Sequence, residues 1–151
     1  MPEVVREMPK HKFKRKYTRE TAARHLQAFL GRVTEYNADP EMPHTILWVV
    51  LFGSYRRGAE KVGDVDLIVD YQNKPDYSQL ARARVSWAVS QGKHFVGLED
   101  VFWPHREMML FLKAGSPVLS FYGQSDLPMA LAEGGVYLVK LGKVLAGSGQ
   151  T

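Results

Sequence analysis

The order of hydrophobic and polar positions along the chain predicts alternating helices and strands. Thr18 has the side chain of a helix N-cap, and apolar residues then recur at helical spacing until about Asn37. Residues 45–52 form an unbroken apolar and β-branched run, which predicts a strand buried on both faces. A second strand is predicted over 64–70. A second helix is predicted over 78–90, where Gly92 ends it.

The second half of the chain continues the alternation with shorter elements. The pattern predicts a strand over 95–103, a helix over 106–113, a strand over 117–122, a helix over 127–133 and a closing hairpin of 136–140 and 144–146. Together these elements predict an α/β (α+β) fold, in which helices pack against one mixed sheet. We expect a single domain over residues 18–151, because the chain has no internal repeat or linker.

The composition restricts the class of protein. A hydrophobic fraction of 45% is sufficient for a buried core. The absence of cysteine excludes disulfides, zinc–thiolate sites and thiol nucleophiles, and is typical of intracellular proteins. The longest apolar run, 46–52, is far shorter than the roughly 20 residues that a membrane-spanning helix needs. The charged N-terminus lacks the apolar core of a secretory signal, so we expect a soluble, cytoplasmic protein.

The net charge of +4 favours anionic partners. Much of the positive charge lies near the start of the chain, at Lys10, Lys12, Lys14, Arg15, Lys16 and Arg19. Residues 1–17 are therefore expected to form a basic arm. The arm has two interpretations that both stay open: a solvated, flexible segment, or a contact for nucleic acid or a partner protein.

Two aspartates open the predicted strand 64–70 and carry the chemical signal. Asp64 and Asp66 are two residues apart, so the period of a strand puts both carboxylates on one face, with α-carbons roughly 6.5 Å apart. Two carboxylates on an otherwise apolar strand repel each other and lose hydration unless a cation neutralises them. Oxygen ligands suit Mg²⁺, with Mn²⁺ as an alternative, and such a metal is commonly shared with substrate phosphates.

The turn before this strand offers donors for anions. Gly53 permits a close approach of the backbone to a ligand, and the Ser54 hydroxyl can bind phosphate oxygens. Arg56 and Arg57 follow, and a guanidinium binds phosphate through two parallel hydrogen bonds. Tyr55 is either a stacking partner for a base or simply exposed. The turn and the strand together predict a site for a metal-bound polyphosphate.

The segment from Gly53 to Asp66 resembles the signature of the DNA polymerase beta-type nucleotidyltransferase superfamily. It has Gly-Ser, a short basic turn and Asp-x-Asp at the start of the next strand, with nine residues between Ser54 and Asp64 as in family X polymerases. The size of the chain is more similar to the minimal nucleotidyltransferases. The resemblance implies a nucleotidyltransferase fold. It also implies phosphate contacts at Gly53, Ser54, Arg57 and Gly63, and metal ligation by Asp64 and Asp66.

The superfamily usually has a third carboxylate on a neighbouring strand, which completes the metal site. The candidates here are Glu99 and Asp100 on the predicted strand 95–103, and their adjacency means that only one of them faces the site. Asp100 is favoured, because the residue in the family is normally aspartate and an apolar residue follows it. Glu99 departs from the usual pattern, in which apolar residues lie on both sides.

The resemblance implies transfer of a nucleoside monophosphate from an NTP, with ATP favoured, to an unidentified hydroxyl acceptor on a protein, an RNA or a small molecule. Pyrophosphate would be released by in-line displacement at the α-phosphorus. Two alternatives stay open: an antitoxin-type enzyme that modifies a partner toxin, and a degenerate module that binds nucleotide or RNA without turnover.

Overall fold

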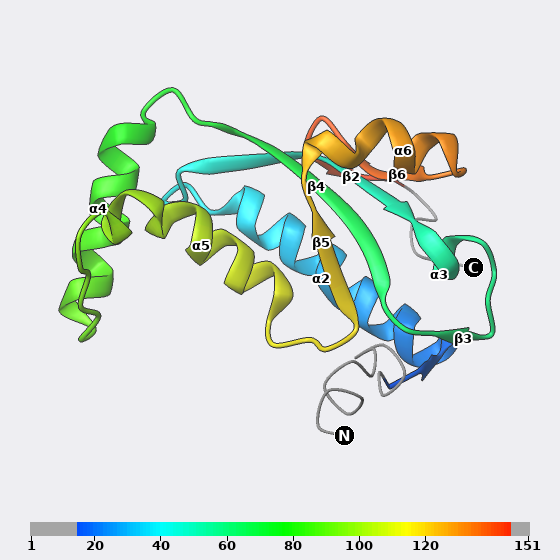
Figure 1. Cartoon of the computed structure of the whole chain (residues 1–151). Coiled ribbons are helices and arrows are strands. Elements are labelled where there is room, and N and C mark those ends of the chain that lie inside the picture. Colours follow the sequence, from blue (N-terminus) through cyan, green and yellow to red (C-terminus); the bar gives the residue numbers. More distant parts are fainter. Residues whose placement is uncertain (1–14, 146–151) are drawn as a thin grey trace, which may run out of the picture.

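The computed structural model describes residues 15–145 and contains a five-stranded mixed sheet flanked by helices (Figure 1). The strand order is β5-β4-β2-β6-β7, and all neighbouring pairs are antiparallel except β4 and β5, which are parallel. The strands of this sheet are β2 (His44–Phe52), β4 (Val65–Asn73), β5 (Leu119–Tyr122), β6 (Val136–Lys140) and β7 (Lys143–Val144). The predicted arrangement of helices against one mixed sheet is confirmed.

The remaining elements surround this sheet. They are β1 (Tyr17–Thr18), α2 (Arg19–Ala38), α3 (Gly53–Arg56), β3 (Lys61–Val62), α4 (Tyr77–Ser90), α5 (Glu99–Lys113), the 3₁₀ turn η2 (Gln124–Asp126) and α6 (Leu127–Ala132). Two short strands, β1 and β3, form a separate antiparallel pair. The N-cap prediction for the first helix is confirmed, because the Thr18 hydroxyl accepts a hydrogen bond from the Thr21 N–H at 3.2 Å.

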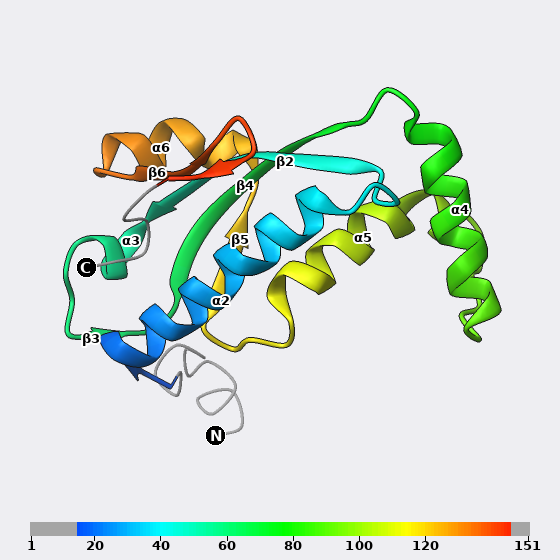
Figure 2. The same cartoon turned by 180° about the vertical axis from the view of Figure 1, so that it is seen from behind.

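The two faces of the sheet have different coverings (Figures 1 and 2). Alternate residues of β2 and β4, such as Leu51 and Leu67, belong to the main core with α2 and α5. The residues between them, such as Val50 and Ile68, form a smaller core with Ala130 of α6. The second face therefore carries the smaller core, and it is covered only in part.

The predicted strand over 95–103 is wrong. Residues 93–96 have no regular structure, and α5 begins at Glu99 and runs through Pro104. Three buried residues of α5, Pro104, Met108 and Leu112, follow one another at intervals of four, which is helical periodicity. The apolar run before Pro104 concealed this longer pattern.

Trp87 lies on α4 and is 51% exposed. The predicted helices and strands over 117–122, 127–133 and 136–140 are confirmed within one or two residues. Among the residues that the structure describes, no helix is long and apolar enough to span a membrane. The predicted basic arm lies outside the described residues except at its end, where Tyr17 pairs with Val62.

Candidate functional site

The glycine turn, residues 53–63, directly follows β2, and Arg19 of α2 is hydrogen-bonded to it. Gly53 has a φ of +83°, in the left-handed region that favours glycine, and it begins the four-residue helix α3. The Arg19 guanidinium donates hydrogen bonds to the carbonyl oxygens of Tyr55 and Ala59, at 2.9 and 2.8 Å. These bonds tie both sides of the turn to the start of α2, so the backbone of the turn is fixed.

Tyr55 is part of the core and not of the ligand surface. Its side chain is fully buried, and the Arg19 guanidinium lies 4.3 Å from the centre of its ring. Both sequence interpretations of Tyr55, as a stacking partner or as an exposed residue, are therefore wrong. The buried ring anchors α3 to the core, so Tyr55 is not among the groups that the turn presents to a ligand.

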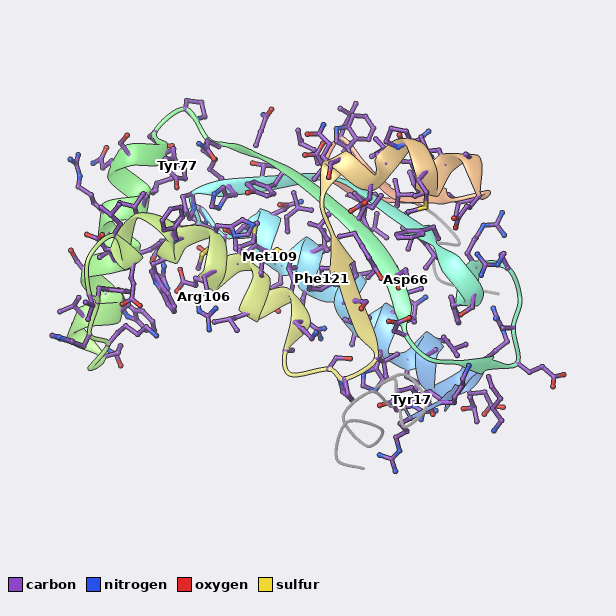
Figure 3. The ribbon with its side chains drawn as sticks, viewed as in Figure 1. Tyr17, Asp66, Tyr77, Arg106, Met109 and Phe121 are labelled. Carbon is purple, nitrogen blue, oxygen red and sulfur yellow. The ribbon has the colours of Figure 1, made fainter. Side chains whose placement is uncertain are left out.

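The acidic pair lies beside this turn on the partly open face of the sheet. Asp64 directly precedes β4, and Asp66 pairs across the sheet with Phe52, the last residue of β2. Both aspartates are half-buried. The Asp66 carboxylate lies so close to the Cα of Gly53 that a Cβ at position 53 would collide with its Oδ2. The structure thus brings Gly53 and Asp66 together, as the sequence predicts, and Asp64 lies two residues before Asp66. Figure 3 labels Asp66 on β4.

The edge strand β5, which pairs with β4, carries no carboxylate opposite the acidic pair. Its Ser120 is the register partner of Asp66. Glu99 and Asp100 lie instead in the exposed first turn of α5, near α4 and away from α3 (Figure 1). The structure therefore does not bring Asp100 to the pair. Within residues 15–145 no group of three His, Cys, Asp or Glu side chains is arranged to hold a metal.

Two hydroxyl groups of β5 occupy this neighbouring position. The Tyr122 phenol lies close to the Asp66 carboxylate and to Ser120, which shares its face of β5. Burial first, and then the negative charges of Asp66 and Asp64, raise the pKa of the Tyr122 phenol, so it stays protonated at neutral pH. The nearby Ser120 hydroxyl lowers the same pKa to a smaller extent.

The strand alternation of 117–122 gives the only sequence signal for these hydroxyls. Ser120 and Tyr122 are two residues apart, so they share one face of β5, while Phe121 points to the opposite face and contacts Phe29 of α2. The sequence alone does not reveal that β5 pairs with β4. Without that pairing, neither hydroxyl can be assigned to the acidic pair.

The arginines of the turn have different surroundings. Arg57 is largely exposed, and its guanidinium lies 3.6 Å from the carboxylate of Glu133, which follows α6. Arg56 is half-buried, and its Nε forms no hydrogen bond. Gly63 lies between β3 and the acidic pair and is half-buried. Arg57 can therefore reach an anion at the turn only in competition with Glu133.

A cavity of about 190 Å³ lies on the same face of the sheet, farther along β2 and β4. Its lining includes Trp48, Asp70 and Tyr137, and the rings of Trp48 and Tyr137 meet edge to face at 5.7 Å between centroids. Trp48 is half-buried, and one side of it lines this cavity. Asp64 and Asp66 do not line this cavity.

Comparison with known proteins relates the site to a family. The family model of the DNA polymerase beta palm matches residues 19–98, more than half of the chain. The matched segment runs from α2 through α4 and contains the glycine turn and the acidic pair, whereas β5 lies outside it. No curated protein and no solved structure matches the chain. The match shows that the chain belongs to the DNA polymerase beta palm family, within the DNA polymerase beta-type nucleotidyltransferase superfamily.

Proposed function

We propose that this protein is a metal-dependent nucleotidyltransferase that moves a nucleoside monophosphate from an NTP to a hydroxyl acceptor. The observation that carries the proposal is the contact between Gly53 and Asp66. It joins the glycine turn, which offers donors for phosphate oxygens, to a carboxylate that suits a divalent cation. Membership of the palm family supports the same assignment.

The residues present fit a divalent cation. Asp64, directly before β4, and Asp66, near its start, are half-buried and supply hard oxygen ligands. The space beside Gly53, which a Cβ would fill, allows the backbone of the turn to approach the same ligand. Mg²⁺ commonly takes one or two carboxylates and completes its coordination with substrate phosphates and water, so two aspartates are sufficient donors. When bound, the cation would neutralise negative charge on the phosphates.

The backbone and side chains of the site have separate roles in nucleotidyl transfer. The backbone of the turn and the Ser54 hydroxyl hold the phosphates of the NTP, and Arg57 adds a guanidinium when it leaves Glu133. The acceptor hydroxyl attacks the α-phosphorus, and pyrophosphate leaves in line with the attack. In such reactions the protein acts by positioning the reactants and by neutralising charge, so no protein nucleophile is required.

Transfer of label tests this function. The full chain is added to a lysate with Mg²⁺ or Mn²⁺ and each of the four α-labelled NTPs in turn, and labelled products are separated by size. The proposal expects a labelled product that is absent with the Asp66→Ala variant. Label that persists at the same level with Asp66→Ala would contradict it.

A second candidate function is nucleotide binding without turnover. Ser120 faces Asp66 from β5, where the superfamily usually has a third carboxylate. The serine at this position favours nucleotide binding without turnover. A binding module would retain metal-dependent NTP binding, measured by calorimetry, and would give no labelled product with any NTP. The two functions are therefore separated by one pair of assays on the same protein.

A further inference from the structure

We propose that the Tyr122 hydroxyl is an acceptor for the nucleoside monophosphate, so that the protein nucleotidylates itself at this residue. The inference rests on the proposed function and names one of its substrates. Tyr122 is 38% exposed, and its phenol lies close to the carboxylate of Asp66, one of the two residues assigned to the metal. An acceptor hydroxyl must reach the α-phosphorus beside these carboxylates, and the Tyr122 hydroxyl already lies there.

The order of the strands places Tyr122 on the correct side for attack. Because β4 lies between β2 and β5, the glycine turn that follows β2 and the hydroxyl of β5 flank Asp66 from opposite sides. Figure 3 shows Asp66 on β4 between β5 and α3. In-line displacement requires the attacking and the leaving oxygen to lie on opposite sides of the phosphorus. Phosphates held by the turn would leave on one side, and the phenol would attack from the other.

The Tyr122 ring is held in this position by two neighbours. Its centroid lies 5.2 Å from that of Phe52, in an edge-to-face contact across β4. At the hydroxyl end, the phenol lies close to Ser120, which shares its face of β5. An acceptor that is fixed beside the reacting phosphorus has a high effective concentration, which favours its modification over that of a free hydroxyl in solution.

The chemical step is balanced without a further reactant. The phenol oxygen of Tyr122 forms a bond to the α-phosphorus, and the bond between that phosphorus and the oxygen bridging to the β-phosphate breaks. Pyrophosphate leaves with this bonding pair of electrons. The phenol proton passes to the nearby Asp66 carboxylate and then to solvent. The product is a phosphodiester between the tyrosine and the nucleoside.

The test uses the full chain with Mg²⁺ and each of the four α-labelled NTPs, without lysate. The proposal expects label on the protein, and mass spectrometry of its peptides should find the added nucleoside monophosphate on Tyr122. Tyr122→Phe keeps the ring and removes the acceptor, so labelling should fall at least tenfold. Tyr137→Phe is the matched control, because Tyr137 lines the neighbouring cavity on the same face, and it should label as the native protein does. Thermal unfolding of each variant verifies that it is folded.

The kinetics supply a second criterion. Because the hydroxyl and the carboxylates belong to one chain, the rate constant for labelling should stay unchanged when the protein is diluted tenfold. Label on another residue, including Ser120, or a rate constant that falls with dilution, would overturn the inference.

The inference and the proposed function can fail separately. An unlabelled protein that transfers label to an acceptor in the lysate would overturn the inference and leave the proposed function intact. NTP binding without transfer to Tyr122 or to any acceptor in the lysate would overturn both the inference and the proposed transferase activity. It would favour the binding module. Absence of NTP binding with every nucleotide would overturn the proposed function itself.

Discussion

The Asp66 carboxylate lies against the Cα of Gly53, in the space that a side chain at position 53 would fill. Two separate segments of the chain, the turn after β2 and the start of β4, thereby share one small volume. The requirement for glycine at position 53 is twofold, since its φ of +83° disfavours other residues and its neighbour leaves no room for a Cβ. The effects of these two causes can be separated by substitution.

Gly53→Ala is expected to abolish metal-dependent NTP binding, because the new methyl group must displace Asp66. Gly58→Ala is a matched control: Gly58 has a φ of +95°, and a Cβ added there would meet no atom within 4 Å. Both variants should lose about 1–2 kcal/mol of unfolding free energy from the left-handed backbone. Calorimetric titration with an NTP and Mg²⁺ checks the difference. Equal binding by the two variants would show that the contact with Asp66 has no role.

The ion pair between Arg57 and Glu133 is expected to compete with phosphate binding. Glu133→Gln should raise the affinity for an NTP about twofold to fivefold at low salt, because an exposed pair of this kind is worth less than about 1 kcal/mol. The gain should shrink at high salt, where the charges are screened. Glu60→Gln is the control, because Glu60 is an exposed residue of the turn that contains Arg57 and its replacement removes the same charge. An equal gain in the two variants would point to net charge instead of Arg57.

Asp100→Asn is expected to leave both NTP binding and transfer unchanged. Asp100 lies in the exposed first turn of α5, whereas the strand beside the acidic pair is β5. Binding and label transfer are measured beside the native protein under identical conditions. A loss of transfer with intact binding would restore Asp100 as the third carboxylate and would require α5 to move.

His44 is expected to make the stability depend on pH. Burial, and secondarily the charge of His105, lower the pKa of His44 to about 4, and the side chain is 2% exposed. Because the unfolded chain takes up this proton near pH 6.5 and the folded chain only near pH 4, stability is full above 6.5 and is lost as the pH falls between these values. Between pH 7.5 and 4.5 the loss is about 2.5 kcal/mol.

Urea unfolding of the native protein and of His44→Phe at both pH values measures this contribution. The variant is expected to be less stable at pH 7.5, because Tyr36 loses its hydrogen bond of 3.3 Å with His44, and to lose less stability on acidification. His94→Gln serves as the control, since His94 is exposed and is not among the groups that lower the pKa of His44. An unchanged pH dependence in His44→Phe would refute the assignment.

The part of the site that the sequence predicts is local. Gly53, Ser54, Asp64 and Asp66 lie within one turn and the strand that follows, so the period of a strand is enough to place both carboxylates on one face. Periodicity also predicts α2 and its Thr18 cap. These features depend on residues that are close in the sequence, so the pattern of hydrophobic and polar positions can predict them.

The parts that the sequence could not predict depend on pairing between distant segments. The choice of Asp100 required a strand at 95–103, but the helical spacing of Pro104, Met108 and Leu112 extends α5 back to Glu99. The pairing of β5 with β4 puts Ser120 and Tyr122 at the acidic pair, and nothing in the hydrophobic pattern specifies that pairing. Tyr55 is buried in the main core, and Arg19, 36 residues earlier in the chain, lies over its ring.

The glycine turn and the acidic pair are tested as one nucleotide site by equilibrium binding of each NTP, with and without Mg²⁺. The proteins compared are the native chain, Asp64→Asn, Asp66→Asn and the control Asp100→Asn. We expect the native protein and Asp100→Asn to bind an NTP only when Mg²⁺ is present, and Asp64→Asn and Asp66→Asn to bind it at least tenfold more weakly. Binding that is equally strong with Asp66→Asn, or that needs no metal, would refute the assignment of the turn and the pair to a single site.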